Sequence, residues 1–341
     1  MNTFWKTLRE SDEYGFLRDN PHLGDNIILL ALGGSYAYGT NNENSDVDIR
    51  GIATNTKRDI LTRRDFENVL DSATDTTIYS FEKMVRLLSQ CNPNTIEILG
   101  LDDDGYGVKT EAGKLLLDNK EIFLSKIAVH SFGGYANAQL RRLENKSARM
   151  VAQSEQEAHI LKSIEHASVT YKERFLPYPE DAIKLYVDKT DREGYDSEIF
   201  MDVNLHRYPL RDYTEMWSEM DNIVRSYSKI GKRNERAIGH DKLGKHMMHL
   251  VRLYLMCFDI LERHEIVTRR DKEHDFLMSI RNGAYLNEQS QPTAEFYEIV
   301  DEFDKRLNYD KENTDLPDRP NQAQIDELVY EVNSKVICKG E

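Results

Sequence analysis

The sequence predicts an α+β protein in two parts, with short strands and helices in residues 1–110 and a mainly helical region over residues 111–341. Three observations lead to this prediction. Residues 26–32 consist of Asn26 and a short, continuously apolar run, 27–32, that ends at two glycines, as a buried strand does. Residues 46–54 alternate between apolar and charged side chains, which is typical of a half-buried strand. After residue 110, most apolar side chains recur at helical spacing.

A third strand is expected over residues 75–79, which are rich in β-branched and aromatic side chains. Ser80 follows as a candidate N-cap, and residues 81–88 carry apolar side chains at helical spacing. We therefore expect a helix to begin directly after this strand.

The second part contains several long periodic segments. We expect helices over residues 127–150, 213–229, 243–263, 271–281, 293–307 and 322–337, and a strand pair near Leu185 and Phe200. The sequence shows no internal repeat and no low-complexity linker, so the two parts are expected to pack together.

The composition limits the classes of partner. The 341 residues include 45 Lys and Arg against 60 Asp and Glu, a net charge of -15 that opposes non-specific attraction to nucleic acid or anionic lipid. The 3 cysteines are far apart, which suits a reducing compartment. The start resembles no leader, and the longest apolar run, residues 27–32, is too short to span a bilayer. We expect a cytoplasmic protein with no membrane partner.

The segment that carries chemistry runs from residue 33 to residue 51. Gly34 and Ser35 stand where a strand turns, so they can offer backbone N–H groups and a hydroxyl to phosphate oxygens. Asp46 and Asp48, two positions apart on a strand, point the same way and can share Mg²⁺. Two such ions suit phosphoryl transfer, with a third carboxylate completing the second site.

A Gly-Ser pair followed after ten residues by Asp-x-Asp resembles the signature of the polymerase-β nucleotidyltransferase superfamily. Further segments of the sequence resemble the branch of this superfamily that is associated with RNA ligases and RNA repair. They are Gly39 in the turn and residues 45–51, 92–99, 245–252, 280–283 and 316–317. The resemblance implies a small mixed β-sheet catalytic core, a nucleoside triphosphate donor and Mg²⁺ as cofactor.

The resemblance also implies a third carboxylate on a strand after the Asp-x-Asp pair. This position falls best on Asp75, although Asp71 and Glu97 are alternatives. Arg50 shares the face of the two aspartates, where it either contacts the triphosphate or neutralises the carboxylates. Glu97, if it is not a ligand, is expected to be a buried acid paired to a cation or a helix terminus.

A basic helix face is the candidate site for the substrate. Lys245, His249 and Arg252 follow the i, i+4, i+7 rule, and we expect them to contact substrate phosphate or base; a solvated basic face and a metal site are the alternatives. Residues 225–252 hold eight basic residues and two acidic ones inside this acidic chain, so the positive charge is localised.

These features predict a Mg²⁺-dependent nucleotidyltransferase that moves a nucleoside monophosphate from a triphosphate to a hydroxyl and releases pyrophosphate. The resemblance implies an RNA 3′ end, such as that of tRNA, as the acceptor. Nucleotidylylation of a protein or a small molecule is the alternative reaction, and a catalytically silent nucleotide-binding regulator is the alternative class.

Overall fold

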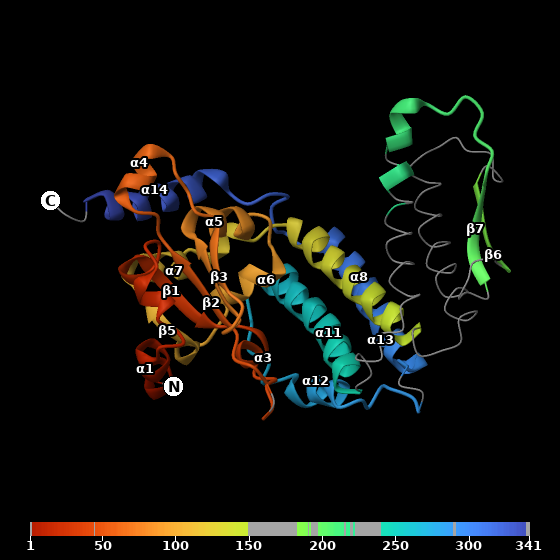
Figure 1. Ribbon diagram of the computed structural model, residues 1–341, viewed down its shortest axis with the longest axis horizontal. Coiled ribbons are helices and arrows are strands. Elements are labelled where there is room, and N and C mark those ends of the chain that lie inside the picture. The colour runs from red at the N-terminus through yellow and green to blue at the C-terminus, as the bar shows by residue number, and fades with distance from the viewer. Residues whose placement is uncertain are drawn as a thin grey trace.

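A mixed sheet in the first third of the chain and a set of long helices make up the structure (Figure 1). The computed structural model describes residues 2–43, 45–148, 183–189, 191, 197–214, 216–218, 221, 240–288 and 291–338. Its strands are β1 Ile27–Leu32, β2 Ile49–Ala53, β3 Asn68–Asp71, β4 Thr76–Ser80, β5 Tyr106–Lys109, β6 Ile183–Lys189 and β7 Ser197–Val203. The α+β prediction is confirmed.

The helices fall into short ones around the sheet and long ones beyond it. The first set is α1 Asn2–Glu10, α2 Phe16–Asp19, α3 Gly34–Tyr38, α4 Lys57–Thr62, α5 Phe81–Leu88, α6 Pro93–Ile96 and α7 Glu111–Asp118. The second set is α8 Ile127–Ala148, α11 His240–Arg263, α12 His274–Arg281, α13 Ala294–Asn313 and α14 Gln322–Cys338. The described residues also form short 3-10 turns: η1 Gly24–Asn26, η2 Glu97–Leu99, η3 Asp103–Gly105 and η4 Lys120–Phe123.

The five-stranded sheet has the order β3-β4-β2-β1-β5. Strand β1 pairs antiparallel with β2 and β5, and β3 pairs antiparallel with β4, whereas β2 and β4 run parallel. The sheet is therefore mixed, and its one parallel pair places the starts of β2 and β4 side by side. That edge of the sheet carries the candidate site.

The sheet is covered on both faces. Trp5 and Leu8 of α1 pack with Leu30 of β1 on one face. The other face packs Leu29 of β1 against α5, α7 and the long helices. Helix α5 begins at the predicted N-cap, since the Ser80 hydroxyl accepts a hydrogen bond from the Lys83 N–H.

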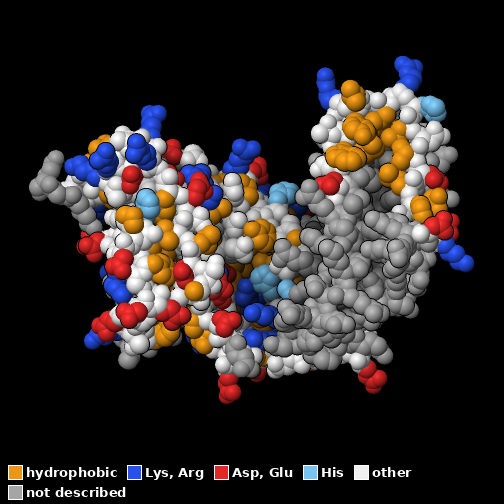
Figure 2. All heavy atoms as spheres, viewed as in Figure 1, with side chains coloured by type: hydrophobic (Ala, Val, Ile, Leu, Met, Phe, Trp, Pro, Cys, Tyr) orange, Lys and Arg blue, Asp and Glu red, His pale blue; other side chains and the backbone are white. Residues whose placement is uncertain are grey.

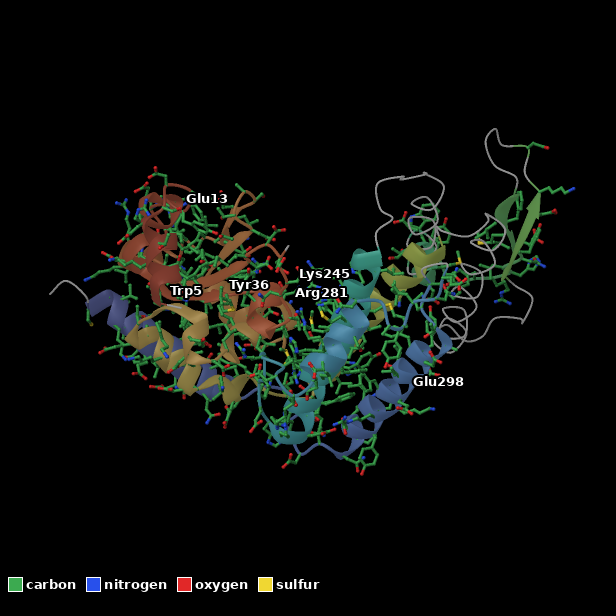
Figure 3. The ribbon with its side chains drawn as sticks, turned by 90° about the horizontal axis from the view of Figure 1, so that it is seen from below. Trp5, Glu13, Tyr36, Lys245, Arg281 and Glu298 are labelled. Carbon is green, nitrogen blue, oxygen red and sulfur yellow. The ribbon has the colours of Figure 1, made fainter. Side chains whose placement is uncertain are left out.

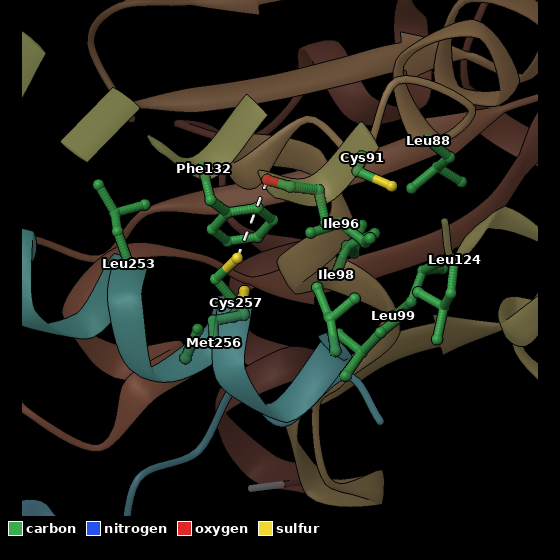
Figure 4. Packing of buried hydrophobic residues seen from close by; sticks show 14 of the residues in the cluster. Leu88, Cys91, Ile96, Ile98, Leu99, Leu124, Phe132, Leu253, Met256 and Cys257 are labelled. Atoms are coloured by element: carbon green, nitrogen blue, oxygen red, sulfur yellow. Dashed lines mark hydrogen bonds between the residues drawn. The ribbon is translucent and has the colours of Figure 1, made fainter. Parts of the chain in front are cut away.

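One hydrophobic core joins the sheet part to the helical part. Figure 4 shows Ile96 and Leu99 packed near Phe132 of α8 and Met256 of α11, all of them buried. The thiol of Cys257 donates to the Ala128 carbonyl in the same core, so it is a core residue here. Helix α14 returns to contact α4 and α7. The boundary between residues 110 and 111 stays a prediction, and apolar packing continues across it.

The strand pair expected near Leu185 and Phe200 is confirmed. Strands β6 and β7 form an antiparallel ribbon in which Leu185 faces Met201 and Tyr186 faces Phe200. It lies beyond the long helices, far from the five-stranded sheet (Figure 1). Most of the helix expected over residues 213–229 lies outside the described residues, as do the last two residues of the 127–150 segment.

Two expected strand starts were wrong. Strand β2 begins at Ile49, not at residue 46, because its partner β1 ends at Leu32, where Gly33 and Gly34 turn the chain. Strand β4 begins after Asp75, because that residue has φ 46°, a left-handed conformation that interrupts the strand.

Two strands of the sheet were not predicted. Strand β3 is a short edge strand, and its Leu70 side chain is exposed, so no apolar alternation marks it. Strand β5 contains Gly107, where a Cβ atom would lie 2.2 Å from the Trp5 ring. Only glycine lets α1 pack this closely on β5.

Candidate active site at the β2–β4 edge

The turn after β1 brings the backbone of Gly34 against the side chain of Asp48. The Gly33 N–H donates to the Asp48 carbonyl at 2.8 Å, which extends the β1–β2 pairing by one bond. Gly34 has φ 54°, and a Cβ atom there would stand 1.7 Å from Oδ2 of Asp48. Glycine is thus required twice, for its conformation and for the close approach of the carboxylate. Ser35 follows as a buried residue of α3, and Gly39 ends that helix with φ 71°.

The carboxyl groups of Asp48 and Asp75 meet at the start of two parallel strands. Ile49 pairs with Thr76, so the residues immediately before them are neighbours. The Ile49 N–H donates to the Asp75 carbonyl at 3.3 Å, and the two carboxyl groups lie within hydrogen-bonding reach. Burial, followed by the nearby Asp75 carboxyl, raises the pKa of Asp48 from 3.8 to about 6, although Arg50 and Lys245 oppose this shift.

Arg50 lies between these two acids. One guanidinium nitrogen donates to the Asp75 carbonyl at 2.7 Å, and the other lies 3.6 Å from Oδ1 of Asp48 and 3.9 Å from Oδ1 of Asp75. The structure therefore shows the neutralising ion pair. A contact between Arg50 and a triphosphate stays a prediction.

Asp46 is placed differently from Asp48. It precedes β2 as an exposed residue of the connecting loop, so the shared strand face expected for the two aspartates is not formed. In the described part of the chain, no group of three or more His, Cys, Asp or Glu side chains is close enough to hold a metal ion. The structure brings together Asp48 and Asp75, with Asp46 on the adjoining loop.

The two alternative third carboxylates have other partners. Asp71 accepts hydrogen bonds from the Thr74 N–H at 2.9 Å and the Thr74 hydroxyl at 2.8 Å, which hold the β3–β4 turn. Glu97 is buried in η2, where it accepts a bond from the Tyr38 hydroxyl at 2.6 Å. The contact with Asp48 therefore favours Asp75 over Asp71 and Glu97.

Helix α11 meets this edge of the sheet from the helical part. Lys245 is exposed, and its ammonium group is near enough to lower the pKa of Asp48. Figure 3 shows Lys245 and Arg281 together, on the side of the sheet that carries Tyr36 of α3. Helices α11 and α12 approach this closely because residue 244 is glycine: a Cβ atom there would lie 2.2 Å from the Arg281 carbonyl oxygen. Lysine, arginine and histidine side chains also gather near the middle of the face in Figure 2.

The other two predicted substrate residues lie one and two turns along α11. Arg252 donates to Nδ1 of His249 at 2.8 Å, and its guanidinium carbon lies 3.4 Å from the centre of the Tyr38 ring. Arg252 is only 8% exposed. The predicted basic stretch 225–252 falls partly outside the described residues, since 222–239 are not among them.

Two residues of the site had no role assigned from the sequence. The Arg281 guanidinium donates to the Thr40 carbonyl and, at 3.4 Å, to the Ser45 hydroxyl, so it holds the loop that leads to Asp46. Tyr38 ends α3 and contacts both Glu97 and Arg252. The only sequence signals were the resemblance over residues 280–283 and a tyrosine directly before Gly39.

The glycine turn, the paired carboxylates at a parallel strand edge and the mixed sheet define the class as a polymerase-β-type nucleotidyltransferase fold. Residues 11–177 match the family model RlaP, described as "RNA repair pathway DNA polymerase beta family". The predicted resemblance is thereby confirmed. No curated protein and no solved structure matches the chain. Within the residues described, no helix combines the length and the apolar character that a bilayer crossing requires.

Proposed function

We propose that this chain transfers a nucleoside monophosphate from a nucleoside triphosphate to a hydroxyl group of RNA, at a 3′ end. The acceptor oxygen bonds to the α-phosphorus, the bond to the β-phosphate oxygen breaks, and pyrophosphate leaves. The single observation that carries this proposal is the Asp48–Asp75 pair beside the Gly34 turn, within a segment that matches an RNA-repair polymerase-β family.

The residues at the strand edge fit a divalent cation. Burial raises the pKa of Asp48 most, its hydrogen bond with the Asp75 carboxyl adds to the rise, and charge repulsion from Asp75 contributes less. A bound cation would offset all three effects. Hard carboxylate oxygens are the ligands that Mg²⁺ prefers. Asp48 and Asp75 would hold Mg²⁺, and Asp46 would supply a further ligand from its loop. Mg²⁺ bound there, as one ion or two, supplies charge neutralisation for the triphosphate and the leaving pyrophosphate.

The remaining residues take roles in binding and placement. Gly34 and Ser35 would receive the phosphate oxygens, with Gly39 ending the turn that presents them. Lys245 is the exposed cation that faces this edge, so we assign it a direct phosphate contact. Arg50 holds the two carboxylates in place through its bonds to both segments. Substrate contact by His249 and Arg252 stays a prediction, and the burial of Arg252 favours an indirect role.

A transfer assay tests the proposal. The protein is incubated with Mg²⁺ and each α-labelled triphosphate, with total RNA and total protein offered together. We expect label in RNA with the wild type and none with Asp48→Asn. Label in a protein band would instead support protein nucleotidylylation, which the net charge of -15 would suit. Nucleotide binding without transfer would support a silent regulator.

A further inference from the structure

Arg252 joins α11 to the end of the phosphate turn. Its guanidinium carbon lies 3.4 Å from the centre of the Tyr38 ring, and a guanidinium nitrogen donates to Nδ1 of His249. A guanidinium stacked on an aromatic ring in a buried setting is held by both dispersion and charge. Arg252 makes both contacts inside the protein, where it is only 8% exposed, so any effect that it has on the substrate passes through its neighbours.

Tyr38 is a meeting point of several segments. It is the last residue of α3, whose first residues are Gly34 and Ser35, and it is 2% exposed. Its hydroxyl donates to Glu97 at 2.6 Å, and its carbonyl accepts from the Arg270 N–H at 3.2 Å. Tyr38 is therefore held in place by Glu97 and Arg270 as well as by Arg252, so it is a fixed point for α11 to stack on.

Lys245 stands seven residues before Arg252 on the same helix. Seven residues make two helical turns, so the two side chains share one face of α11, about 10 Å apart along its axis. Arg252 fixes one point of this face against Tyr38, and Gly244 fixes another against Arg281. With both points fixed, the distance between Lys245 and the Asp48 carboxylate is set.

We propose that Arg252 is a positioning residue, which sets Lys245 of α11 against the Gly34–Ser35 turn by stacking on Tyr38. This inference rests on the proposed function, because it assigns to Lys245 and that turn the binding of a triphosphate. It predicts that Arg252 contributes to triphosphate binding only through Lys245.

A double-mutant cycle tests this dependence. The probe is inorganic triphosphate with Mg²⁺, and its binding to the full chain is measured by titration calorimetry. We expect Lys245→Met and Arg252→Met each to weaken binding about tenfold, as for the loss of one charged contact. The double variant should also lose about tenfold, rather than the product of about 100-fold that independent sites give. An additive cycle, or unchanged binding by Arg252→Met, would overturn the proposal.

Two further variants complete the test. Arg306 is a matched control, because its guanidinium carbon lies 4.1 Å from the centre of the Phe258 ring at the other end of α11. Arg306→Met should bind triphosphate as the wild type does, and an equal loss there would overturn the proposal in favour of general helix packing. If Arg252→Met does not fold, Arg252→Lys takes its place in the cycle. A wild type that binds no triphosphate would reject the proposed function itself.

Discussion

Oδ2 of Asp48 occupies the space that a side chain on Gly34 would need, 1.7 Å from the position of its Cβ atom. The turn that is proposed to receive phosphate and the carboxylate that is proposed to hold metal are therefore in direct contact. A change in either one reaches the other.

We expect Gly34→Ala to disturb this contact. The positive φ and the clash with Asp48 should lower the free energy of unfolding by about 1–3 kcal/mol and abolish nucleotide transfer. Gly134→Ala on α8 is the matched control, because nothing lies within 4 Å of its Cβ position, and it should gain about 0.5–1 kcal/mol. Thermal unfolding measures the stability changes of both variants, and a transfer assay measures their activity. Equal stability and equal activity of the two variants would contradict the role of Gly34.

The Asp48 carboxyl should make stability depend on pH. Because its pKa is raised from 3.8 to about 6, the folded chain binds a proton more tightly than the unfolded chain does. The protonated Asp48 carboxyl therefore contributes its full stabilisation below pH 4, and this contribution is lost as the pH rises through about 6. Asp48→Asn should therefore be more stable than the wild type at pH 7 without divalent cations, by about 1 kcal/mol after allowance for solvent screening.

Urea unfolding in EDTA at pH 7 and pH 4 measures this difference. It should shrink at pH 4, and Mg²⁺ at pH 7 should stabilise the wild type but not Asp48→Asn. A variant that is less stable than the wild type at pH 7 would contradict the cost of an ionised Asp48 that is buried beside Asp75.

The choice of third carboxylate is tested by a pair of substitutions on the same hairpin. Asp75→Asn should abolish transfer, because its carboxyl lies next to Asp48. Asp71→Asn should keep most of the activity, since an amide oxygen still accepts the bonds from Thr74. Transfer rates at saturating Mg²⁺ separate the two residues, and the opposite ranking would assign the role to Asp71.

The buried Tyr38–Glu97 bond should be worth more than an ordinary tyrosine hydrogen bond. Tyr38→Phe leaves the buried Glu97 carboxyl without its donor and should cost about 1–3 kcal/mol in the free energy of unfolding. Tyr106→Phe is the matched control, because the Tyr106 hydroxyl donates to the neutral Ile98 carbonyl at 2.7 Å. Its cost should be smaller, about 1 kcal/mol. Equal losses in urea unfolding would show that the buried Glu97 carboxyl strengthens this hydrogen bond no more than a backbone carbonyl does.

The sequence could predict those elements whose own residues specify them. Strand β1 is a continuous apolar run, and α5 has its Ser80 cap, so both were found. Strand β3 lies at an exposed edge and β5 accommodates Trp5 at a glycine, so neither has a local signature. The residue at which β2 begins depends on where its partner strand β1 ends. For this reason the sequence alone placed the start of β2 at residue 46 and not at Ile49.

The contacts of the site depend on pairing between distant segments. Asp48 and Asp75 meet because β2 and β4 run parallel, a fact that the spacing of residues does not contain. Glu97 was considered both as a ligand and as a buried acid paired to a cation or a helix terminus. Burial raises its pKa, and the nearby cation Arg252 opposes that rise. The bond from Arg281 to the Thr40 carbonyl spans 241 residues, so only the fold reveals it.

The most direct test of the central claim compares one triphosphate labelled at the α-phosphate with the same triphosphate labelled at the γ-phosphate. With wild-type protein, Mg²⁺ and RNA, the α label should enter the RNA, whereas the γ label should appear only in pyrophosphate. With Asp75→Asn, neither α-labelled RNA nor γ-labelled pyrophosphate should form. Transfer of the γ label to the acceptor, or α transfer that survives Asp75→Asn, would contradict nucleotidyl transfer at the Asp48–Asp75 site.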